Sequence, residues 1–328
     1  MMKAIQADRI DSLADYAEVD LPAPEPRAGQ VRIRVEAVGV GYVDALVALG
    51  RYQVKPQVPH VPGSEIAGVI DALGEGVTVL GVGDRVMAMG GRGFAGQALA
   101  PAAMTFVLPQ VVSLEQGAAL PLNHLTALHG LADRGGLKAG ETLLVLGAAG
   151  GVGAAAIQVG KLVGARVIAA ASTPEKRDYA LSLGADSVID TAPEGWRDRL
   201  KAALGGAPLN VVFDPVCGPL FEPAFRSLGW GGRHLVVGFV GGPIPALGAN
   251  LTLMKGAALV GVDVRQFMLF EAAAARAHLR TLVDWVASRR FTPPVGRVFA
   301  WPDFGEALTF ALSGQGLGKA VLRVDGAA

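Results

Sequence analysis

A glycine-rich segment that follows a run of apolar residues is the part of this sequence best suited to chemistry. Leu143–Leu146 predict a buried strand, and a helix is predicted at residues 151–163. Between them the spacing is Ala-x-Gly-x-x-Gly, with Ala148, Gly150 and Gly153. Glycine lets the backbone approach a phosphate closely, and the amides at the start of a helix stabilise its charge.

A strand, a glycine loop and a helix in this order predict a dinucleotide-binding site. The alternative is that the glycines only allow the helix to pack tightly on the strand. The residues predicted to contact the nucleotide are Ala149, Gly150, Gly151, Val152 and Gly153.

The residues after the next predicted strand indicate which dinucleotide is bound. Ser172, Thr173, Lys176 and Arg177 stand where NAD-dependent proteins usually have an acidic residue that binds the ribose. A hydroxyl and two cations would bind a 2′-phosphate, which a carboxylate would repel. The sequence therefore predicts NADPH, bound through Ser172, Lys176 and Arg177. The alternative is that Ser172 or Thr173 caps the following helix while the cations are solvated, although capping and phosphate binding can coexist.

The other reactive side chains indicate neither a metal site nor a nucleophile. A single cysteine, Cys217, excludes an internal disulfide and a cysteine-based zinc cluster, and its apolar neighbours predict a buried thiol. His124 and His129 flank Thr126 and could face a cleft, but histidines in such positions are more often structural. No Gly-x-Ser-x-Gly elbow is present. Three further histidines form no pair at metal-ligand spacing: His60, His234 and His278.

These candidate residues need a sheet to position them, and the second part of the sequence predicts a parallel one. From about residue 123 onward, strand-like runs alternate with helical windows, which is typical of an α/β fold with a doubly wound parallel sheet. A long helix is predicted at about 270–289, followed by a last helix at 304–312 and a last strand at 320–324. Up to about residue 120, short strand-like runs broken by glycine and proline predict an irregular β domain. The six predicted strands of the parallel sheet are 141–147, 165–171, 187–191, 210–214, 233–239 and 257–263.

Length, composition and charge exclude several classes of protein. A chain of 328 residues predicts two domains, and 51% hydrophobic with 18% charged residues excludes global disorder. The 29 basic residues balance 29 acidic ones, which argues against a nucleic-acid partner or a membrane surface. Charged residues near the start leave no recognisable secretory signal, and one cysteine suits a reducing compartment. We therefore expect a cytoplasmic protein.

Short motifs along the whole sequence fit one family pattern. They are Gly147–Gly153, Val61–Val69, Leu125–Ala127, Asp214–Val216, Gly238–Phe239 and Gly318–Leu322. In this order they resemble the quinone oxidoreductase (zeta-crystallin-like) branch of the zinc-free medium-chain dehydrogenase/reductase superfamily. The resemblance implies a GroES-like, mainly β catalytic domain at 1–121 and 293–328, and a Rossmann NADPH-binding domain at 122–292. It also implies an active site between the domains and a homodimer joined along the last Rossmann strand, about Ala257 to Asp263.

The same resemblance implies roles for individual residues. Tyr42, Asp44 and Tyr52 belong to the segment expected to form the acceptor pocket. Tyr52 could donate a hydrogen bond to the acceptor or only wall the pocket, and Asp44 could instead cap or brace a helix. The residues that the resemblance implies for the NADPH site, beyond the glycine loop and the turn at Ser172, are Thr126, Val216, Gly238, Phe239 and Lys319.

Zinc-dependent members of the superfamily have a cysteine where this sequence has Gly41 and a histidine where it has Ser64. Neither residue is a zinc ligand, so no zinc is expected and no Lewis acid is available to polarise a substrate oxygen. Gly41 and Leu46 also lack the hydrogen-bonding side chains that relatives often carry there.

The leading hypothesis is an enzyme that transfers reducing equivalents from NADPH to a quinone without a metal. Quinone reduction scarcely requires a proton relay because solvent can protonate the product. The first alternative is reduction of an activated alkene, such as an enone, a 2-alkenal or an enoyl thioester of coenzyme A. The second alternative is an NADPH-binding protein with little turnover.

Overall fold

The computed structural model describes residues 1–325, and its internal contacts divide the chain into two units. The first unit comprises Met1–Leu122 and the chain from Leu279 onward, and the second comprises Asn123–His278. The sequence suggested a return to the first domain at residue 293, whereas the contacts place it earlier, inside a helix. Within the described residues no helix has both the length and the apolar character that a membrane crossing needs.

The second unit is built on a six-stranded sheet. Its strands are β8 (Thr142–Val145), β9 (Arg166–Ala170), β10 (Ser187–Ile189), β11 (Val211–Asp214), β12 (Arg233–Val236) and β13 (Ala258–Gly261). Their order is β10-β9-β8-β11-β12-β13, and every neighbouring pair is parallel. This order confirms the predicted doubly wound sheet, in which the strand sequence reverses beside β8.

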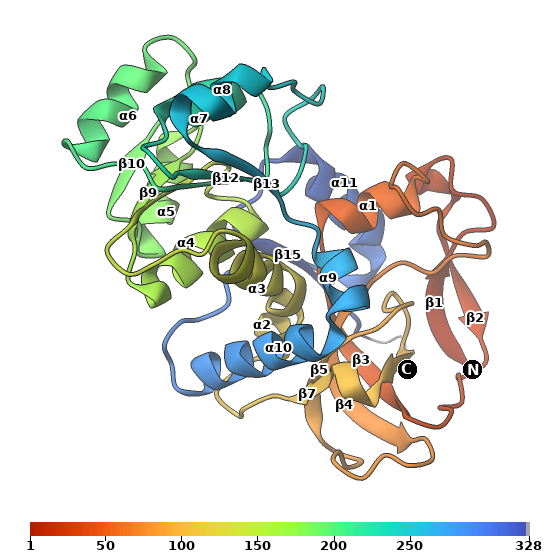
Figure 1. The fold of residues 1–328 in the computed structure, drawn as a ribbon. Helices are drawn as coiled ribbons and strands as arrows, with labels where there is room; N and C mark the ends of the chain where they lie inside the picture. The colour runs from red at the N-terminus through yellow and green to blue at the C-terminus, as the bar shows by residue number, and fades with distance from the viewer. Residues whose placement is uncertain (326–328) are drawn as a thin grey trace. The chain divides into compact units, whose positions relative to one another are not determined.

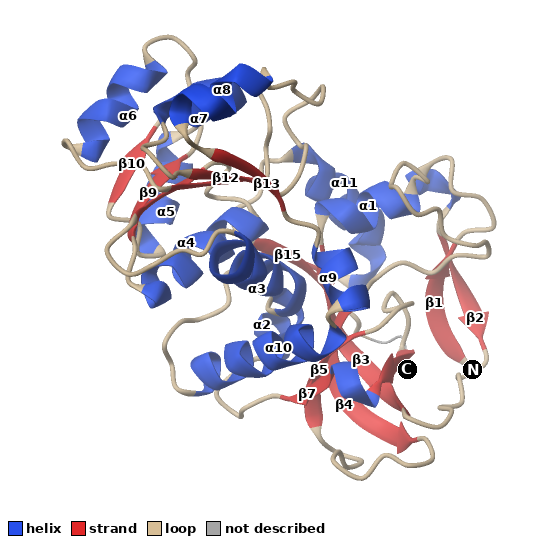
Figure 2. Ribbon diagram, in the orientation of Figure 1, coloured by secondary structure: helices blue, strands red, loops and turns tan. Residues whose placement is uncertain are grey.

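Helices cover both faces of this sheet. Figures 1 and 2 show α4 (Gly151–Val163) and α5 (Pro174–Ser182) on one face, and α6 (Trp196–Leu204), α7 (Phe221–Ser227) and α8 (Ala249–Lys255) on the other. The predicted helix over 151–163 matches α4, which ends where Gly164 adopts φ +89°. The helix α3 (Pro121–Leu128) precedes the sheet and continues into a π-helical turn at His129–Arg134.

Large apolar side chains fill the space between the sheet and its helices. Trp196, Phe213 and Phe225 are fully buried, together with the aliphatic residues of β8 and β9. Each such side chain stabilises the fold by about 1.5–3 kcal/mol relative to leaving it exposed. The apolar strand runs read from the sequence are therefore the core of this unit.

The long helix predicted at about 270–289 is confirmed as α10 (Ala272–Ala287). A short helix that the sequence did not predict, α9 (Val264–Phe270), precedes it, and Glu271 at φ −125° and ψ 42° separates the two. Asp263 caps α9 by accepting a hydrogen bond from the Gln266 amide at 3.0 Å.

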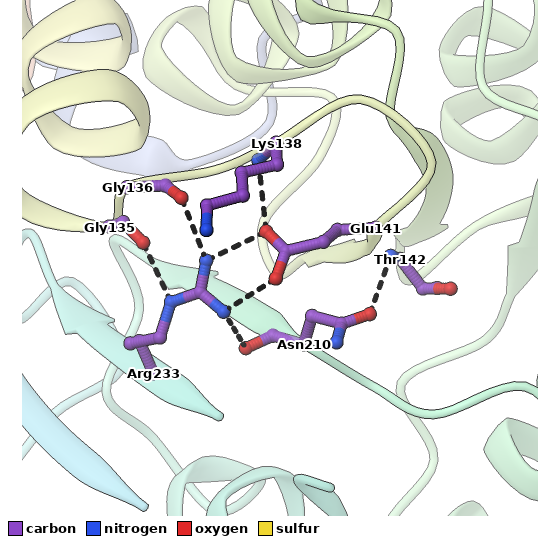
Figure 3. A network of polar contacts seen from close by, with 7 residues as sticks. All are labelled: Gly135, Gly136, Lys138, Glu141, Thr142, Asn210 and Arg233. Atoms are coloured by element: carbon purple, nitrogen blue, oxygen red, sulfur yellow. Dashed lines mark hydrogen bonds and ion pairs between the residues drawn. The ribbon is translucent and has the colours of Figure 1, made fainter. Parts of the chain in front are cut away.

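An ion-pair network joins the beginnings of β8, β11 and β12 (Figure 3). The Arg233 guanidinium donates to both carboxylate oxygens of Glu141, at 2.8 and 2.7 Å. It also donates to the carbonyl oxygens of Gly135 and Gly136, at 2.6 and 3.1 Å. Only 19% of the Arg233 side chain and 20% of the Glu141 side chain are exposed. This bidentate pair holds the ends of the strands opposite to those that carry the glycine loop.

The first unit is mainly β, as predicted. Its strands are β1 (Met2–Gln6), β2 (Ala17–Leu21), β3 (Gln30–Val40), β4 (Glu65–Leu73), β5 (Arg85–Met89), β6 (Gln97–Pro101), β7 (Thr105–Val107), β14 (Val295–Phe299) and β15 (Lys319–Arg323). Its helices are α1 (Tyr42–Ala48), α2 (Leu114–Ala119), α11 (Phe304–Ser313) and the part of α10 from Leu279 onward, and single 3₁₀ turns lie at Leu13–Asp15, Ala102–Met104 and Trp301–Asp303.

The larger sheet of this unit runs β14-β15-β3-β4-β5-β7, with β6 also paired to β3, while β1 and β2 form a separate ribbon. The long strand β3 is the centre of the sheet because it pairs antiparallel with β4, β6 and β15. Segments from the beginning and the end of the chain therefore lie side by side in one sheet.

Candidate functional site

The glycine loop lies between β8 and α4 in the second unit, as the sequence predicted. Gly147 has φ +58°, which favours glycine, and Gly150 is the N-cap residue of α4. A Cβ on Gly153 would lie 2.2 Å from the carbonyl oxygen of Gly147, so this glycine is required for packing of the helix on the loop. A Cβ on Gly150 would have no neighbour closer than 3.6 Å, so packing does not require that glycine.

The turn after β9 carries the side chains predicted to select the nucleotide. Thr173 is the N-cap residue of α5 and accepts a hydrogen bond from the Lys176 amide at 3.2 Å, so the capping interpretation holds for Thr173. Ser172 is exposed beside it. The Arg177 guanidinium donates to the carbonyl oxygens of Ala171 and Ser172, at 3.1 and 3.3 Å. Positive charge is therefore held against the turn, next to an exposed hydroxyl.

The segment after β11 packs against the glycine loop. The buried carboxylate of Asp214 accepts hydrogen bonds from the amides of Val216 and Cys217, at 2.9 and 2.8 Å. Val216 Cγ2 lies only 2.8 Å from where a Cβ on Gly147 would stand. A Cβ on Gly238, after β12, would lie 3.0 Å from the carbonyl oxygen of Pro215. The structure thus brings Val216 and Gly238 to the same edge of the sheet as the loop.

Asp214 is itself held by a histidine that sequence reasoning did not connect to it. His234 Nε2 lies 3.0 Å from Asp214 Oδ2, and both side chains are fully buried. The two residues stand on the adjacent strands β11 and β12, so only the strand order could have revealed the pair.

The single cysteine has the properties expected of an inert thiol. Cys217 is buried, and burial raises the pKa of its thiol to about 12, with the charge of Asp214 acting in the same direction. A thiol with such a pKa is neutral at physiological pH and is a poor nucleophile.

The histidines near Thr126 make structural contacts. Thr126 and His124 are buried on α3, and His124 Nε2 lies 3.0 Å from Gln158 Oε1. His129 Nδ1 and His278 Nε2 each lie 2.8 Å from the same oxygen, Oδ2 of Asp133. The structural interpretation of these histidines therefore fits the contacts.

The predicted acceptor-pocket residues belong to the first unit. Tyr42 begins α1 and Tyr52 lies in the loop after it, and both are partly exposed. Asp44 is 8% exposed and accepts hydrogen bonds from the Gly41 amide at 2.8 Å and the Ser64 hydroxyl at 3.2 Å. Its carboxylate thus caps α1, which was the alternative raised for this residue.

Lys319 was expected at the cofactor, and the structure places it inside the first unit in an ion pair. Its Nζ contacts Oε1 of Glu65, and the two side chains are 3% and 0% exposed. Oε2 of Glu65 accepts a hydrogen bond from the Leu122 amide at 3.0 Å. The sequence drew attention to each residue separately, in the motifs at 61–69 and 318–322, but gave no sign that they pair.

Two family models match most of the chain. "Alcohol dehydrogenase GroES-like domain" matches residues 27–110, and "Zinc-binding dehydrogenase" matches residues 151–287. The human quinone oxidoreductase is 31% identical over 311 residues, which cover 92% of each chain. The chain belongs to the quinone oxidoreductase branch of the medium-chain dehydrogenase/reductase superfamily. It is an oxidoreductase of that superfamily, and the resemblance carried by its motifs is confirmed.

Other members of the branch are similar over comparable lengths. The bovine quinone oxidoreductase-like protein 2 is 33% identical over 295 residues, covering 89% of this chain and 84% of its own. Among solved structures, the quinone oxidoreductase of Thermus thermophilus, also studied in complex with NADPH, is 33% identical with a TM-score of 0.85. That match covers 98% of this chain and all of the other.

The name of one matching model raises the question of zinc, and the donors in this branch member do not fit a zinc ion. The two positions at which zinc-dependent members place a cysteine and a histidine hold Gly41 and Ser64. Residues 1–325 contain no group of three or more His, Cys, Asp or Glu side chains that could hold a metal ion.

Proposed function

We propose that the protein binds NADPH on its second unit and transfers the reducing equivalents to a quinone. The observation that carries the proposal is Gly150 at the start of α4. Packing against the rest of the protein does not require a glycine at this position. A phosphate at that place would explain the missing side chain and would meet the amides of the helix. The relative from Thermus thermophilus, studied with NADPH, supports the choice of nucleotide.

Each part of the site has a defined task in this proposal. The loop amides hold the diphosphate, Ser172 with Arg177 and Lys176 holds the 2′-phosphate, and Val216 with Gly238 lies beside the loop at the same edge of the sheet. Thr126 and Phe239 are assigned to the nicotinamide end, and Tyr42 and Tyr52 to the acceptor pocket. Bound NADPH supplies a hydride, and a quinone that accepts it becomes a hydroquinone after taking a proton from water.

We expect Ser172→Asp to reverse the nucleotide preference. The new carboxylate would repel the 2′-phosphate of NADPH and would accept hydrogen bonds from the ribose of NADH, so the ratio of the two dissociation constants should change by at least about tenfold. Fluorescence titration with each nucleotide measures the two dissociation constants. Ser182→Asp is the matched control because it adds the same charge at an exposed site near the other end of α5. Equal affinity of the unmodified protein for NADPH and NADH would contradict the proposal.

The acceptor is tested by following NADPH oxidation with a panel of quinones and a panel of enones and enoyl thioesters. We expect the larger kcat/KM with quinones, because Asp44 is engaged in helix capping and quinone reduction needs no dedicated proton donor. A preference of tenfold or more for enones would make alkene reduction the function. Tight NADPH binding without turnover of either panel would favour the cofactor-binding protein.

We further propose that the protein is a homodimer joined along β13. This strand ends the six-stranded sheet, and Leu259 on it is 42% exposed. An unpaired edge with exposed apolar residues is a template for pairing with a second copy. Light scattering should give twice the chain mass, and Leu259→Lys should shift it toward the monomer, whereas Val79→Lys at an exposed loop should not. A monomeric unmodified protein at micromolar concentration would refute the proposal.

The remaining assignments rest on composition. A formal net charge of zero and a single cysteine support a cytoplasmic protein whose partners are small molecules, with no nucleic acid and no membrane among them.

A further inference from the structure

The first unit contains a buried cluster of one cation and two carboxylates that the proposed function does not use. Lys319 Nζ pairs with Glu65 Oε1, and burial raises the pKa of Glu65, with the charge of Asp44 acting in the same direction and that of Lys319 against it. The exposed fractions are 3% for Lys319, 0% for Glu65 and 8% for Asp44. Charges removed from water to this extent are tolerated only when they compensate one another.

Two glycines, one near the end of β3 and one just after it, lie against the lysine side chain. A Cβ on Gly39 would lie 2.4 Å from the Ala118 carbonyl oxygen and 2.9 Å from Lys319 Cε, and a Cβ on Gly41 would lie 3.0 Å from Lys319 Nζ. A Cβ on Gly41 would also lie 3.3 Å from Asp44 Oδ2. A side chain at position 41 would therefore make a tight contact with the ammonium group.

The positions around this ammonium group are those that bind zinc in zinc-dependent members. Gly41 has the place of the cysteine ligand and Ser64 the place of the histidine ligand. Here the Gly41 amide and the Ser64 hydroxyl both donate to Asp44, and the next residue, Glu65, accepts from Lys319. The cluster thus keeps two carboxylates but has exchanged the softer ligands for a glycine and a hydroxyl.

We propose that the ammonium group of Lys319 is a resident cation that takes the place of a divalent metal ion in this cluster. It supplies positive charge to Glu65 and Asp44 and fills the volume beside Gly41 that an ion would need. The Lys319 ammonium group excludes a metal ion from the cluster. Removing the Lys319 side chain converts the cluster into a cation site with oxygen ligands from Glu65, Asp44 and Ser64. The proposal does not depend on the nucleotide or the acceptor, so it can fail while the proposed function stands.

The test compares the unmodified protein with Lys319→Ala and Lys319→Arg, each first freed of metal by chelation. Thermal unfolding is then followed with and without added Mn²⁺ or Zn²⁺, and bound metal is counted after gel filtration. We expect either ion to raise the unfolding temperature of Lys319→Ala by about 5 °C or more, with close to one ion per chain. The unmodified protein and Lys319→Arg should show no shift and bind no stoichiometric metal.

Two results would overturn the proposal: stoichiometric metal in the unmodified protein, or a folded Lys319→Ala that neither binds nor responds to the ions. If Lys319→Ala does not fold, the double variant Glu65→Gln/Lys319→Met decides, because it removes the uncompensated carboxylate together with the cation. A folded double variant without metal uptake supports compensation of charge as the role of Lys319. A double variant that also fails to fold refutes charge compensation as the role of Lys319.

Discussion

Replacing Gly150 with alanine is expected to weaken NADPH binding by at least about tenfold with only a small loss of stability, since alanine is a weaker N-cap residue than glycine. The backbone at Gly150 has φ −72°, which alanine adopts without strain, and the new methyl group would meet no protein atom closer than 3.6 Å. The loss of affinity would therefore come from the phosphate that the methyl group displaces. Titration of NADPH together with thermal unfolding separates the two effects.

The matched control is Gly153→Ala in the same loop. Its methyl group would lie 2.2 Å from the Gly147 carbonyl oxygen and 2.9 Å from Ala148 Cα, and backbone atoms cannot yield as a flexible side chain does. We expect this variant to lose about 1–3 kcal/mol of stability as well as affinity. If Gly150→Ala binds NADPH as tightly as the unmodified protein does, the phosphate does not approach the loop at that residue.

Replacing Arg233 with alanine is expected to lower the free energy of unfolding by about 3 kcal/mol. The change leaves the Glu141 carboxylate mostly buried without its bidentate partner, and the carbonyl oxygens of Gly135 and Gly136 lose their donors (Figure 3). Urea denaturation at neutral pH measures the loss. Arg226→Ala is the control, because the Arg226–Glu222 pair has side chains that are 45% and 46% exposed, and such pairs contribute about 1 kcal/mol or less.

The Arg233–Glu141 pair also predicts how the difference in unfolding free energy between the unmodified protein and Arg233→Ala changes with pH. Hydrogen bonds from Arg233 hold the pKa of Glu141 below its usual range. A lowered pKa in the folded state gives stability that is fully present above the unfolded value of about 4.3 and is lost as the pH falls through the folded value. The gap between the unmodified protein and Arg233→Ala should therefore narrow below about pH 4. A gap that stays constant down to about pH 3 would show that the carbonyl contacts alone account for the effect.

The sequence predicted the parallel sheet well because its central strands β8, β9 and β11 are buried and appear as short apolar runs. It predicted α4 because the glycine loop marks the beginning of that helix and Gly164 marks its end. The first unit was harder, since short strands such as β2 are mostly exposed and carry mixed residues. The short helix α9 was missed because its seven residues make too few turns for an apolar periodicity to stand out.

The candidate site likewise contains some features that are local in the sequence and others that depend on contacts between distant residues. The glycine loop and the turn at Ser172 are local features, so their residue types and spacing were enough to predict their places in the fold, before α4 and before α5. Lys319 and Glu65 are 254 positions apart, and their contact exists only because β15 pairs with β3 beside β4. Pairings of this kind depend on the topology of the sheet, which no local pattern records.

The participation of β15 in the sheet of the first unit also affects the order of events during synthesis on the ribosome. The second unit is one contiguous stretch, Asn123–His278, and can complete its sheet while translation continues. The first unit must wait until residues 319–323 leave the exit tunnel, and until then the nascent chain holds an acidic group at position 65 with no basic partner. We therefore expect the amino-terminal segment, Met1–Leu122, to depend more on chaperones than the second unit does, although this segment is synthesised first.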